Sequence, residues 1–408
     1  MNRTRKPVFQ RSRRTAPLSL KKTLPVIAVL ALATTLATCN LRPISRSLTW
    51  YGYMDTTGQM VIPMKFDDAL HFSEGLAAVK VGTKWGYIDK NGQVVIEPQF
   101  LAARDFKQGR ARVEVAPDTW CYVDSTGKVA VRLNFKYGIH ARDFSEGFAA
   151  VYIEDPNRFE CLSSIQQDVR EDYDGERGYV STPFCGRWGF IRQDGTFAVE
   201  PQFIEAFDFA EELAAIRVRD PNTNDQRLWR YGYMGRNGAV VIQPQFDAAF
   251  DFSEGIARVV VAGRKRFIDK TGKFLTEGNF DDVKDFHEGL AQVKVGDRWG
   301  YVDKNGKMVI PPEFKTAGPF SEGLASANRS GNLGGYIDRT GAMVIREQFG
   351  VAWPFSDGLA RVQIGDGRGI VDRWGYIDRS GKVVISRMLK AGWPFREGLA
   401  LVGDGGPI

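Results

Sequence analysis

Histidine is scarce in this chain of 408 residues, which contains three: His71, His140 and His287. Most acid–base and metal-binding schemes need more imidazoles than that, and turn or rim positions near the repeated Phe-x-Glu-Gly segments explain all three. A glycine-rich phosphate loop, a serine nucleophile elbow and a zinc motif are also lacking. We therefore expect no enzymatic activity, no cofactor and no bound metal.

Cysteine is rare as well, with four residues and no two-cysteine metal spacing. Cys161 and Cys185 lie 24 residues apart in one long inserted segment, and Cys121 replaces a glycine inside a repeated strand. We predict a disulfide between Cys161 and Cys185, which would stabilise the chain by roughly 3 kcal/mol through loop-closure entropy. Two free buried thiols are the alternative.

Acidic residues are missing from the first 22 positions, which carry a charge of +8 from Arg3, Arg5, Lys6, Arg11, Arg13, Arg14, Lys21 and Lys22. Because the whole chain has a formal charge of +6, the remainder carries −2. A nucleic-acid partner needs Lys and Arg clustered on the folded domain to neutralise phosphates. The basic charge therefore belongs to the leader, and we expect no nucleic-acid binding.

The basic segment is followed by an uncharged apolar stretch from Leu24 to Leu41, so residues 1–41 have the order of an export signal or a signal anchor. The positive charge on its N-terminal side predicts an extracytoplasmic location for everything that follows. Cys39, in the sequence Leu36-Ala37-Thr38-Cys39, is a candidate lipidation site, although Thr38 departs from the usual small residue. Cleavage, lipidation and retention as a membrane anchor remain alternatives. Any membrane contact is expected through this segment only.

One sequence pattern recurs nine times between residues 50 and 403, in units that start near 51, 85, 120, 188, 231, 265, 299, 334 and 374. A complete unit has an aromatic-Gly-aromatic strand, an Asp-x-x-Gly turn, an apolar run, Phe-x-Glu-Gly and Leu-Ala, and some units depart from it at single positions. In the second unit, 76–81, 85–89 and 93–96 have strand composition and are separated by short turns. Each unit therefore predicts a three-stranded antiparallel meander.

The recurring residues have structural interpretations. Asp with Gly three residues later fits a type I turn, in which Asp accepts a backbone hydrogen bond and Gly takes positive φ. The glycine between aromatics is predicted to let the next unit pack directly on the strand. The residues assigned to this repeated framework are Trp85, Gly86, Trp188, Gly189, Trp299, Gly300, Trp374 and Gly375.

An isolated meander of this size is barely stable, so neighbouring units must bury each other's apolar faces. We expect an all-β fold built as a tandem array of about nine three-stranded repeats. An open, solenoid-like superhelix is favoured over a closed propeller, because three strands are few for a blade and nine blades are many.

Length variation is concentrated between the first and second predicted strands, with insertions at 153–187, 220–230 and 366–373. In a regular array these connections lie along one edge, where repeat proteins commonly vary their binding. The first insertion is strongly acidic. It offers the candidate binding residues Glu154, Asp155, Glu160, Asp172, Tyr173, Asp174 and Tyr179. A solvated excursion without a partner is the alternative.

The combined pattern WGYIDxxGxxVI…FxEGLAxV resembles the WG-repeat family over residues 50–403. Trp85, Trp188, Trp299 and Trp374 keep the tryptophan, whereas the sixth unit, Lys265-Arg266-Phe267, loses both Trp and Gly. The resemblance implies bacterial origin and repeat-mediated binding. It implies no shared enzymatic activity and no catalytic residue.

We expect a non-enzymatic extracytoplasmic scaffold that binds an unknown protein partner in the bacterial cell envelope, including the periplasm. The alternative is binding of a glycan or of the cell wall through exposed tryptophan faces, although the apolar alternation predicts that the tryptophans are buried. A hydrolase is a weaker alternative, in which recurring glutamates supply a carboxylate pair. Those glutamates are Glu74, Glu146, Glu254, Glu288, Glu322 and Glu397.

Overall fold

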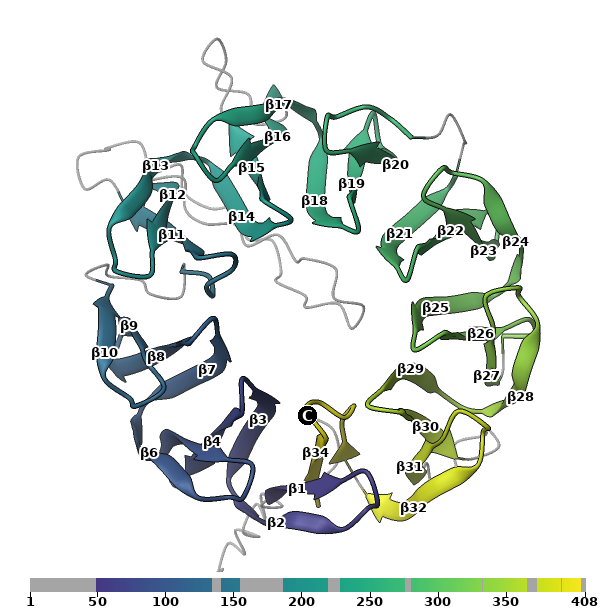
Figure 1. Ribbon diagram of the computed structural model, residues 1–408, viewed down its shortest axis with the longest axis horizontal. Coiled ribbons are helices and arrows are strands. Elements are labelled where there is room, and N and C mark those ends of the chain that lie inside the picture. Colours follow the sequence, from purple (N-terminus) through teal and green to yellow (C-terminus); the bar gives the residue numbers. More distant parts are fainter. Residues whose placement is uncertain are drawn as a thin grey trace, which may run out of the picture. The chain divides into compact units, whose positions relative to one another are not determined.

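The computed structural model describes residues 49–133, 141–154, 186–218, 228–275, 280–331, 333–364, 373–389 and 391–404. These residues form nine small antiparallel sheets arranged in a ring, the architecture of a nine-bladed β-propeller (Figure 1). The leader, residues 1–41, lies outside the described residues. Within the described ranges, no helix has the length and apolar character needed to cross a membrane.

Blades are numbered in chain order, and strands within a blade run from the central opening outward. Blade 1 contains β33 (Ala391–Gly392), β34 (Leu399–Gly403), β1 (Tyr51–Asp55) and β2 (Met60–Phe66). Blade 2 contains β3 (Asp68–Ser73), β4 (Leu76–Val81), β5 (Lys84–Asp89) and β6 (Val94–Phe100). Blade 3 contains β7 (Ala102–Lys107), β8 (Arg110–Ala116), β9 (Thr119–Val123) and β10 (Val129–Arg132). Blade 4 contains β11 (Phe148–Glu154), β12 (Gly186–Arg192) and β13 (Phe197–Phe203). In this blade β11 is the second strand, because residues 141–145 at the inner edge form isolated bridges with β11 in place of a named strand.

The other five blades follow the same order. Blade 5 contains β14 (Glu205–Ala210), β15 (Leu213–Val218), β16 (Arg230–Gly235) and β17 (Val240–Phe246). Blade 6 contains β18 (Ala248–Ser253), β19 (Ile256–Val261) and β20 (Arg264–Asp269). Blade 7 contains β21 (Asp282–His287), β22 (Leu290–Val295), β23 (Arg298–Asp303) and β24 (Met308–Phe314). Blade 8 contains β25 (Thr316–Ser321), β26 (Leu324–Asn328), β27 (Gly334–Ile337) and β28 (Met343–Phe349). Blade 9 contains β29 (Ala352–Ser356), β30 (Leu359–Ile364), β31 (Arg373–Ile377) and β32 (Val383–Leu389).

The prediction of an open array of three-stranded units is wrong. Strands at 76–81 and 85–89 are present, but a segment outside the three predicted strands, such as 68–73, is a fourth strand at the inner edge of a blade. Each sequence unit therefore supplies strands to two blades. The last unit leaves β33 and β34 in need of a partner, and the first unit supplies β1, which pairs with β34 from Tyr51↔Gly403 to Asp55↔Leu399.

The core consists of clusters of buried side chains that each join two neighbouring blades. Nine such clusters occur in the described residues. An open array of nine blades would contain eight interfaces. The ninth interface joins blade 9 to blade 1 and includes Tyr376, Ile385 and Phe395. Burying this last pair of apolar faces removes both ends of the array from water, which favours the closed ring.

Tyrosine hydroxyls add polar links between blades. The second aromatic of the aromatic-Gly-aromatic strand donates a hydrogen bond to a carbonyl on the inner strand of the next blade. Examples are Tyr87 to Arg104, at 2.7 Å, and Tyr301 to Gly318, at 2.8 Å. These rings are fully buried, so the pairing satisfies hydroxyl groups that would otherwise be costly to bury.

The glycine between the aromatics has a different role from the one predicted. A Cβ atom on Gly86 would lie 2.4 Å from the carbonyl oxygen of Ile96, which belongs to the outer strand of the same blade. The pairing of β5 with β6 is irregular at this point. The glycine thus allows a bulge within its own blade, rather than close packing by the next unit. Contact with the preceding blade is made by the turn glycine, since a Cβ on Gly92 would meet Ile62 at 3.2 Å.

Blade 6 contains the aromatic strand of the sixth unit, which lacks the Trp-Gly pair. Arg266 occupies the position of the bulge glycine, and the outer strand is reduced to an isolated bridge between Ile268 and Phe274 in the described residues. This agrees with the steric role of glycine in the other blades.

Candidate functional site

The inner turns of the nine blades lie around one mouth of the ring. Each turn connects the first two strands of a blade, and its leading residue has positive φ, between 51° and 55°. A side chain in this conformation is uncommon, but here it reaches the neighbouring blade. The nine residues, which we call the turn ring, are Glu74, Gln108, Glu146, Glu211, Glu254, Glu288, Glu322, Asp357 and Glu397.

Every member of the turn ring accepts a hydrogen bond from a backbone amide in the corresponding turn of the next blade. The amide of Gly109 donates to Glu74, and the relay continues around all nine blades with N···O distances of 2.6–3.1 Å. The relay closes where Gly75 donates to Glu397. Eight carboxylates and one amide therefore lock the first turns of adjacent blades together.

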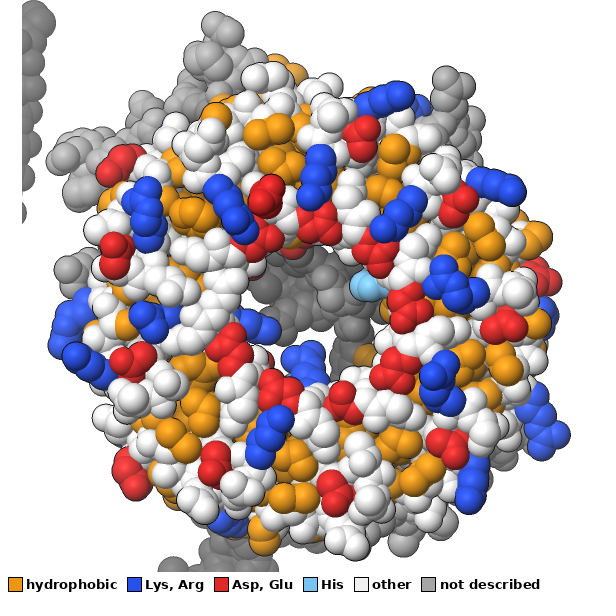
Figure 2. Space-filling view, in the orientation of Figure 1, with side chains coloured by type: hydrophobic (Ala, Val, Ile, Leu, Met, Phe, Trp, Pro, Cys, Tyr) orange, Lys and Arg blue, Asp and Glu red, His pale blue; other side chains and the backbone are white. Residues whose placement is uncertain are grey.

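Cations from the outer turns pair with five of these carboxylates. The pairs are Lys90 with Glu397, Arg236 with Glu146, Lys270 with Glu211, Lys304 with Glu254, and Arg339 with Glu288, at 2.8–3.8 Å. At the position of the neutral Gln108, the equivalent outer turn has Gln193 instead of a cation. The side-chain amide of Gln193 donates a hydrogen bond to the backbone carbonyl of Gln108. Figure 2 shows acidic side chains at the inner rim of the mouth with basic side chains outside them.

The electrostatics favour the ionised state of the ring. For Glu397, partial burial opposes ionisation, but hydrogen bonds from Lys90 and from the amides of Gly75 and Glu74 outweigh it and lower the pKa. The same causes lower the pKa of Glu146 beside Arg236 and of Glu254 beside Lys304. A glycosidase general acid needs a raised pKa, so these three carboxylates have the opposite property.

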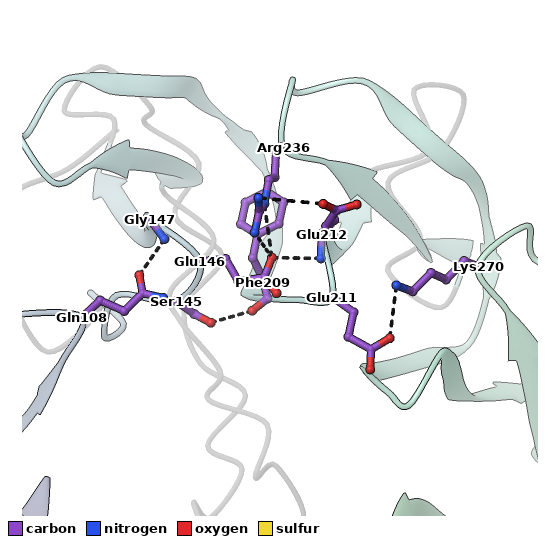
Figure 3. Close-up of polar contacts among 9 residues, drawn as sticks. All are labelled: Gln108, Ser145, Glu146, Gly147, Phe209, Glu211, Glu212, Arg236 and Lys270. Atoms are coloured by element: carbon purple, nitrogen blue, oxygen red, sulfur yellow. Dashed lines mark hydrogen bonds and ion pairs between the residues drawn. The ribbon is translucent and has the colours of Figure 1, made fainter. Parts of the chain in front are cut away.

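One inner turn differs from the other eight in its second residue. Glu212 occupies the position of the second turn residue, which is glycine in the other eight blades, with φ of +74°. Its amide donates to Glu146, and Arg236 lies close to both side chains (Figure 3). A depression of about 440 Å³ adjoins these residues and reaches Lys270.

The turn aspartates predicted from the sequence cap their turns. Asp89 Oδ1 accepts from the amides of Asn91 and Gln93, at 2.9 and 2.8 Å. At Asp55, a hydrogen bond from the Thr57 side chain followed by backbone amides lowers the pKa. No three or more His, Cys, Asp or Glu side chains come together as a metal site in the described ranges.

The four tryptophans of the repeated Trp-Gly pair are buried or half-buried. Trp85 and Trp188 are buried, at 9% and 5% exposure, whereas Trp299 and Trp374 are half-buried. Cationic side chains cover the two half-buried rings, with Lys294 5.8 Å from the Trp299 centroid and Arg361 3.6 Å from that of Trp374. Their arrangement disfavours a glycan platform made of these rings.

The candidate binding segment is described only at its ends. Glu154 pairs with Gly186 at the end of the β11–β12 ladder. The other predicted residues, Asp155, Glu160, Asp172, Tyr173, Asp174 and Tyr179, lie outside the described residues, as do Cys39, Cys161 and Cys185. Cys121 is a buried free thiol.

The three inserted segments leave from equivalent places. Each connects the second and third strands of a blade, after β11, β15 and β30. Because successive strands are antiparallel, these strand ends lie on the face opposite the turn ring. We call this the insertion face.

The inner wall contains polar residues that the sequence analysis missed. At the third position of the second strand, blades 2, 4 and 5 have Ala78, Ala150 and Ala215, whereas blades 6 and 7 have Arg258 and Gln292. Both polar side chains are 3% exposed. Comparing the same position across units does not single them out, because blades 3, 8 and 9 have Arg112, Ser326 and Arg361 there. Their burial in the folded ring distinguishes Arg258 and Gln292.

Three solved structures show some similarity to this chain. A crystal structure of a eukaryotic initiation factor matches with a TM-score of 0.53 and 11% identity, covering 88% of this chain and 99% of that one. Apo AztD from Citrobacter koseri has a TM-score of 0.38 and 12% identity, with 88% and 99% covered. BamB from Moraxella catarrhalis has a TM-score of 0.32 and 9% identity, with 82% and 84% covered. At 11% identity, the likeness to the initiation factor structure extends to the fold alone.

No curated protein matches the sequence. The model of the "WG containing repeat" matches nine times, at residues 51–85, 85–116, 120–155, 188–220, 231–264, 266–299, 299–332, 335–367 and 374–406. Together with the nine blades and their aromatic-Gly strands, these matches establish that the chain belongs to the WG-repeat family.

Proposed function

We propose that this protein is an exported, non-enzymatic scaffold that binds a protein partner in the bacterial cell envelope through the insertion face. The basic leader and apolar stretch support export. The main observation behind the proposal is that the repeated carboxylates already have hydrogen-bond partners in the neighbouring blades. Each member of the turn ring already accepts a backbone hydrogen bond from the next blade, so these side chains have a framework role.

The insertion face supplies the variable part of the scaffold. The β11–β12 ladder is regular from Phe148↔Arg192 to Glu154↔Gly186, so the blade holds both ends of the acidic segment in fixed positions. A rigid base with variable segments on one face is a common arrangement for binding in repeat proteins. The acidic composition of residues 154–176 favours a cationic partner surface.

The test replaces residues 155–185 with the two-residue turn Gly82-Thr83, which connects the same strands in blade 2. Affinity purification after crosslinking of intact envelopes then compares this variant with the full chain. We expect specific partners of the full chain to be lost while thermal unfolding stays nearly unchanged. As a matched control, the same replacement of residues 219–227 in blade 5 reports on a less acidic insertion. Unchanged partners, or unfolding of the ring, would contradict the proposal.

A further inference from the structure

The inner wall of the ring is not ninefold symmetric. A phenylalanine recurs at the inner edge of every blade. The residue before it is Asp in five consecutive blades, from Asp105 in blade 3 to Asp285 in blade 7. In blades 8, 9 and 1 the same position is Pro319, Pro354 and Pro394. The wall therefore has an acidic arc and an apolar arc.

A cavity of about 460 Å³ lies where the two arcs meet. Its lining comes from the inner strands β21, β25 and β29 and from the second strands β19, β22 and β26. This volume is typical of small-molecule sites. Arg258, Asp285 and Gln292 form its polar side, and Pro319, Trp353 and Pro354 form its apolar side.

Two cations line the cavity, Arg258 and Lys284, and both already have interaction partners. Arg258 Nε lies 3.1 Å from Asp285 Oδ1, and Arg258 Nη1 donates to the Val283 carbonyl at 3.3 Å. The guanidinium also lies 4.0 Å from the centroid of Phe250. A ligand carboxylate or phosphate would have to compete with Asp285, so the site favours a ligand without net charge.

Gln292 leaves a hydrogen-bond acceptor unused. Its side chain is 3% exposed, and its Oε1 atom accepts no hydrogen bond from the described residues. A buried acceptor without a donor is costly, and native proteins usually satisfy such a group with water or a ligand. The lining of the cavity thus combines the Gln292 amide oxygen, which lacks a hydrogen-bond donor, with the apolar surface of Trp353 and the prolines.

We propose that this cavity binds a neutral carbohydrate of about one or two sugar rings. A hydroxyl of the sugar donates to Gln292 Oε1, while the C–H face of the ring packs on Trp353. Arg361 lies 5.5 Å from the centroid of the Trp353 ring but does not line the cavity, so it leaves the cavity side of that ring to the sugar. Carbohydrates combine these two properties, hydroxyl donors around the edge and an apolar face, in one uncharged molecule. This site is independent of the insertion face and of the covered tryptophans of the repeat.

The test is calorimetric titration of the purified full chain with four uncharged probes: glucose, maltose, N-acetylglucosamine and its β1,4-linked disaccharide. We expect saturable binding of at least one probe. Gln292→Leu should weaken that binding about tenfold or more, because it removes the acceptor of a buried hydrogen bond. Trp353→Ala should weaken it similarly. Trp393→Ala is the matched control, since Trp393 holds the equivalent position in blade 1 and does not line the cavity.

Unfolding of the ligand-free variants supplies a second readout. Gln292→Leu removes an unsatisfied acceptor, so its midpoint of thermal unfolding should stay the same or rise. A folded Gln292→Leu variant that binds the sugar as tightly as the original chain overturns the proposal. The absence of saturable binding to all four probes also overturns it, as does a Trp393→Ala variant that loses as much affinity as Trp353→Ala.

Discussion

Lys90 and Glu397 are 307 residues apart in the chain, yet Lys90 Nζ lies 3.1 Å from Glu397 Oε2. The pair bridges blade 2 and blade 1, and Glu397 also accepts from the amide of Glu74 at 2.7 Å. Equivalent pairs join blades that are neighbours in sequence, such as Lys304 with Glu254 at 3.0 Å. The contact of the last unit with the second unit, across blades 1 and 2, is thus built like the contacts between other neighbouring blades.

Removing the Glu397 carboxylate should weaken the closure of the ring. Glu397→Ala leaves two backbone amides without their acceptor and Lys90 without its ion pair, so we expect a loss of about 1–2 kcal/mol in the free energy of unfolding. Glu397→Gln should lose less, because Gln108 performs the same role between blades 3 and 4. Denaturant unfolding measures both changes. Equal stability of Glu397→Ala and the original chain would contradict the structural role.

The bulge glycine should tolerate no side chain. In Gly86→Ala, the added Cβ would lie 2.4 Å from the Ile96 carbonyl oxygen, so the outer strand must move. We expect a loss of about 2–3 kcal/mol in unfolding free energy. Gly82→Ala is the control, because Gly82 has positive φ but open space around it, and it should cost about 1 kcal/mol. A smaller loss for Gly86→Ala than for Gly82→Ala would refute the steric explanation.

Glycine at position 212 should stabilise the ring. Glu212 adopts φ of +74°, a region that costs an L-residue about 1–2 kcal/mol, and its exposed carboxylate adds negative charge beside Glu211. After allowing for the greater flexibility of glycine in the unfolded chain, Glu212→Gly should gain about 0.5–1 kcal/mol. The reciprocal substitution Gly255→Glu should destabilise blade 6. Thermal unfolding of the two variants should therefore change in opposite directions.

Stability should also depend on pH through His71. Burial, together with the positive charge of Arg396, lowers the pKa of His71 from 6.5 to about 4. The folded chain therefore binds fewer protons than the unfolded chain between these values, and unfolding free energy should fall as the pH decreases from about 6.5 to 4. His71→Leu should flatten this part of the profile. A profile that does not change in the variant would show that other groups cause the decline.

The carboxylates add a separate decline at lower pH. The pKa values of Asp55, Asp124, Asp338 and Asp378 are lowered by a neighbouring hydroxyl and by backbone amides. Their stabilisation is present above the unfolded pKa, near 4, and is lost as the pH falls through the lower folded values. This decline should persist in His71→Leu, which separates the two effects.

The repeated strands and turns could be predicted from the sequence because local chemistry specifies them. Asp89 and Gly92 define a turn, and the alternation around Tyr87 defines a strand. The inner strand was missed because a segment such as 68–73 contains a bulge between Ala69 and Phe72, which interrupts the alternation. Closure of the ring was missed because it depends on the first and last units, each of which supplies only part of blade 1. Among the described residues, the first unit begins with β1 at Tyr51, and the last ends with β33 and β34.

The candidate cavity was harder to predict because its lining comes from several blades. Gln292 and Trp353 are 61 residues apart in sequence, and each looks like a variation within a repeated strand. Only the ring brings them to one cavity. The sequence offered little signal, because the position of Arg258 and Gln292 also holds arginine in blades 3 and 9, at Arg112 and Arg361.

The most direct test of the closed ring is zero-length carbodiimide crosslinking of the monomeric protein, followed by mass spectrometry. This chemistry joins an amine to a carboxylate that it already contacts. The closed ring predicts an intramolecular Lys90–Glu397 crosslink at a yield similar to that of Lys304–Glu254, the positive control between consecutive blades. A monomer that forms the Lys304–Glu254 crosslink but no Lys90–Glu397 crosslink would contradict closure.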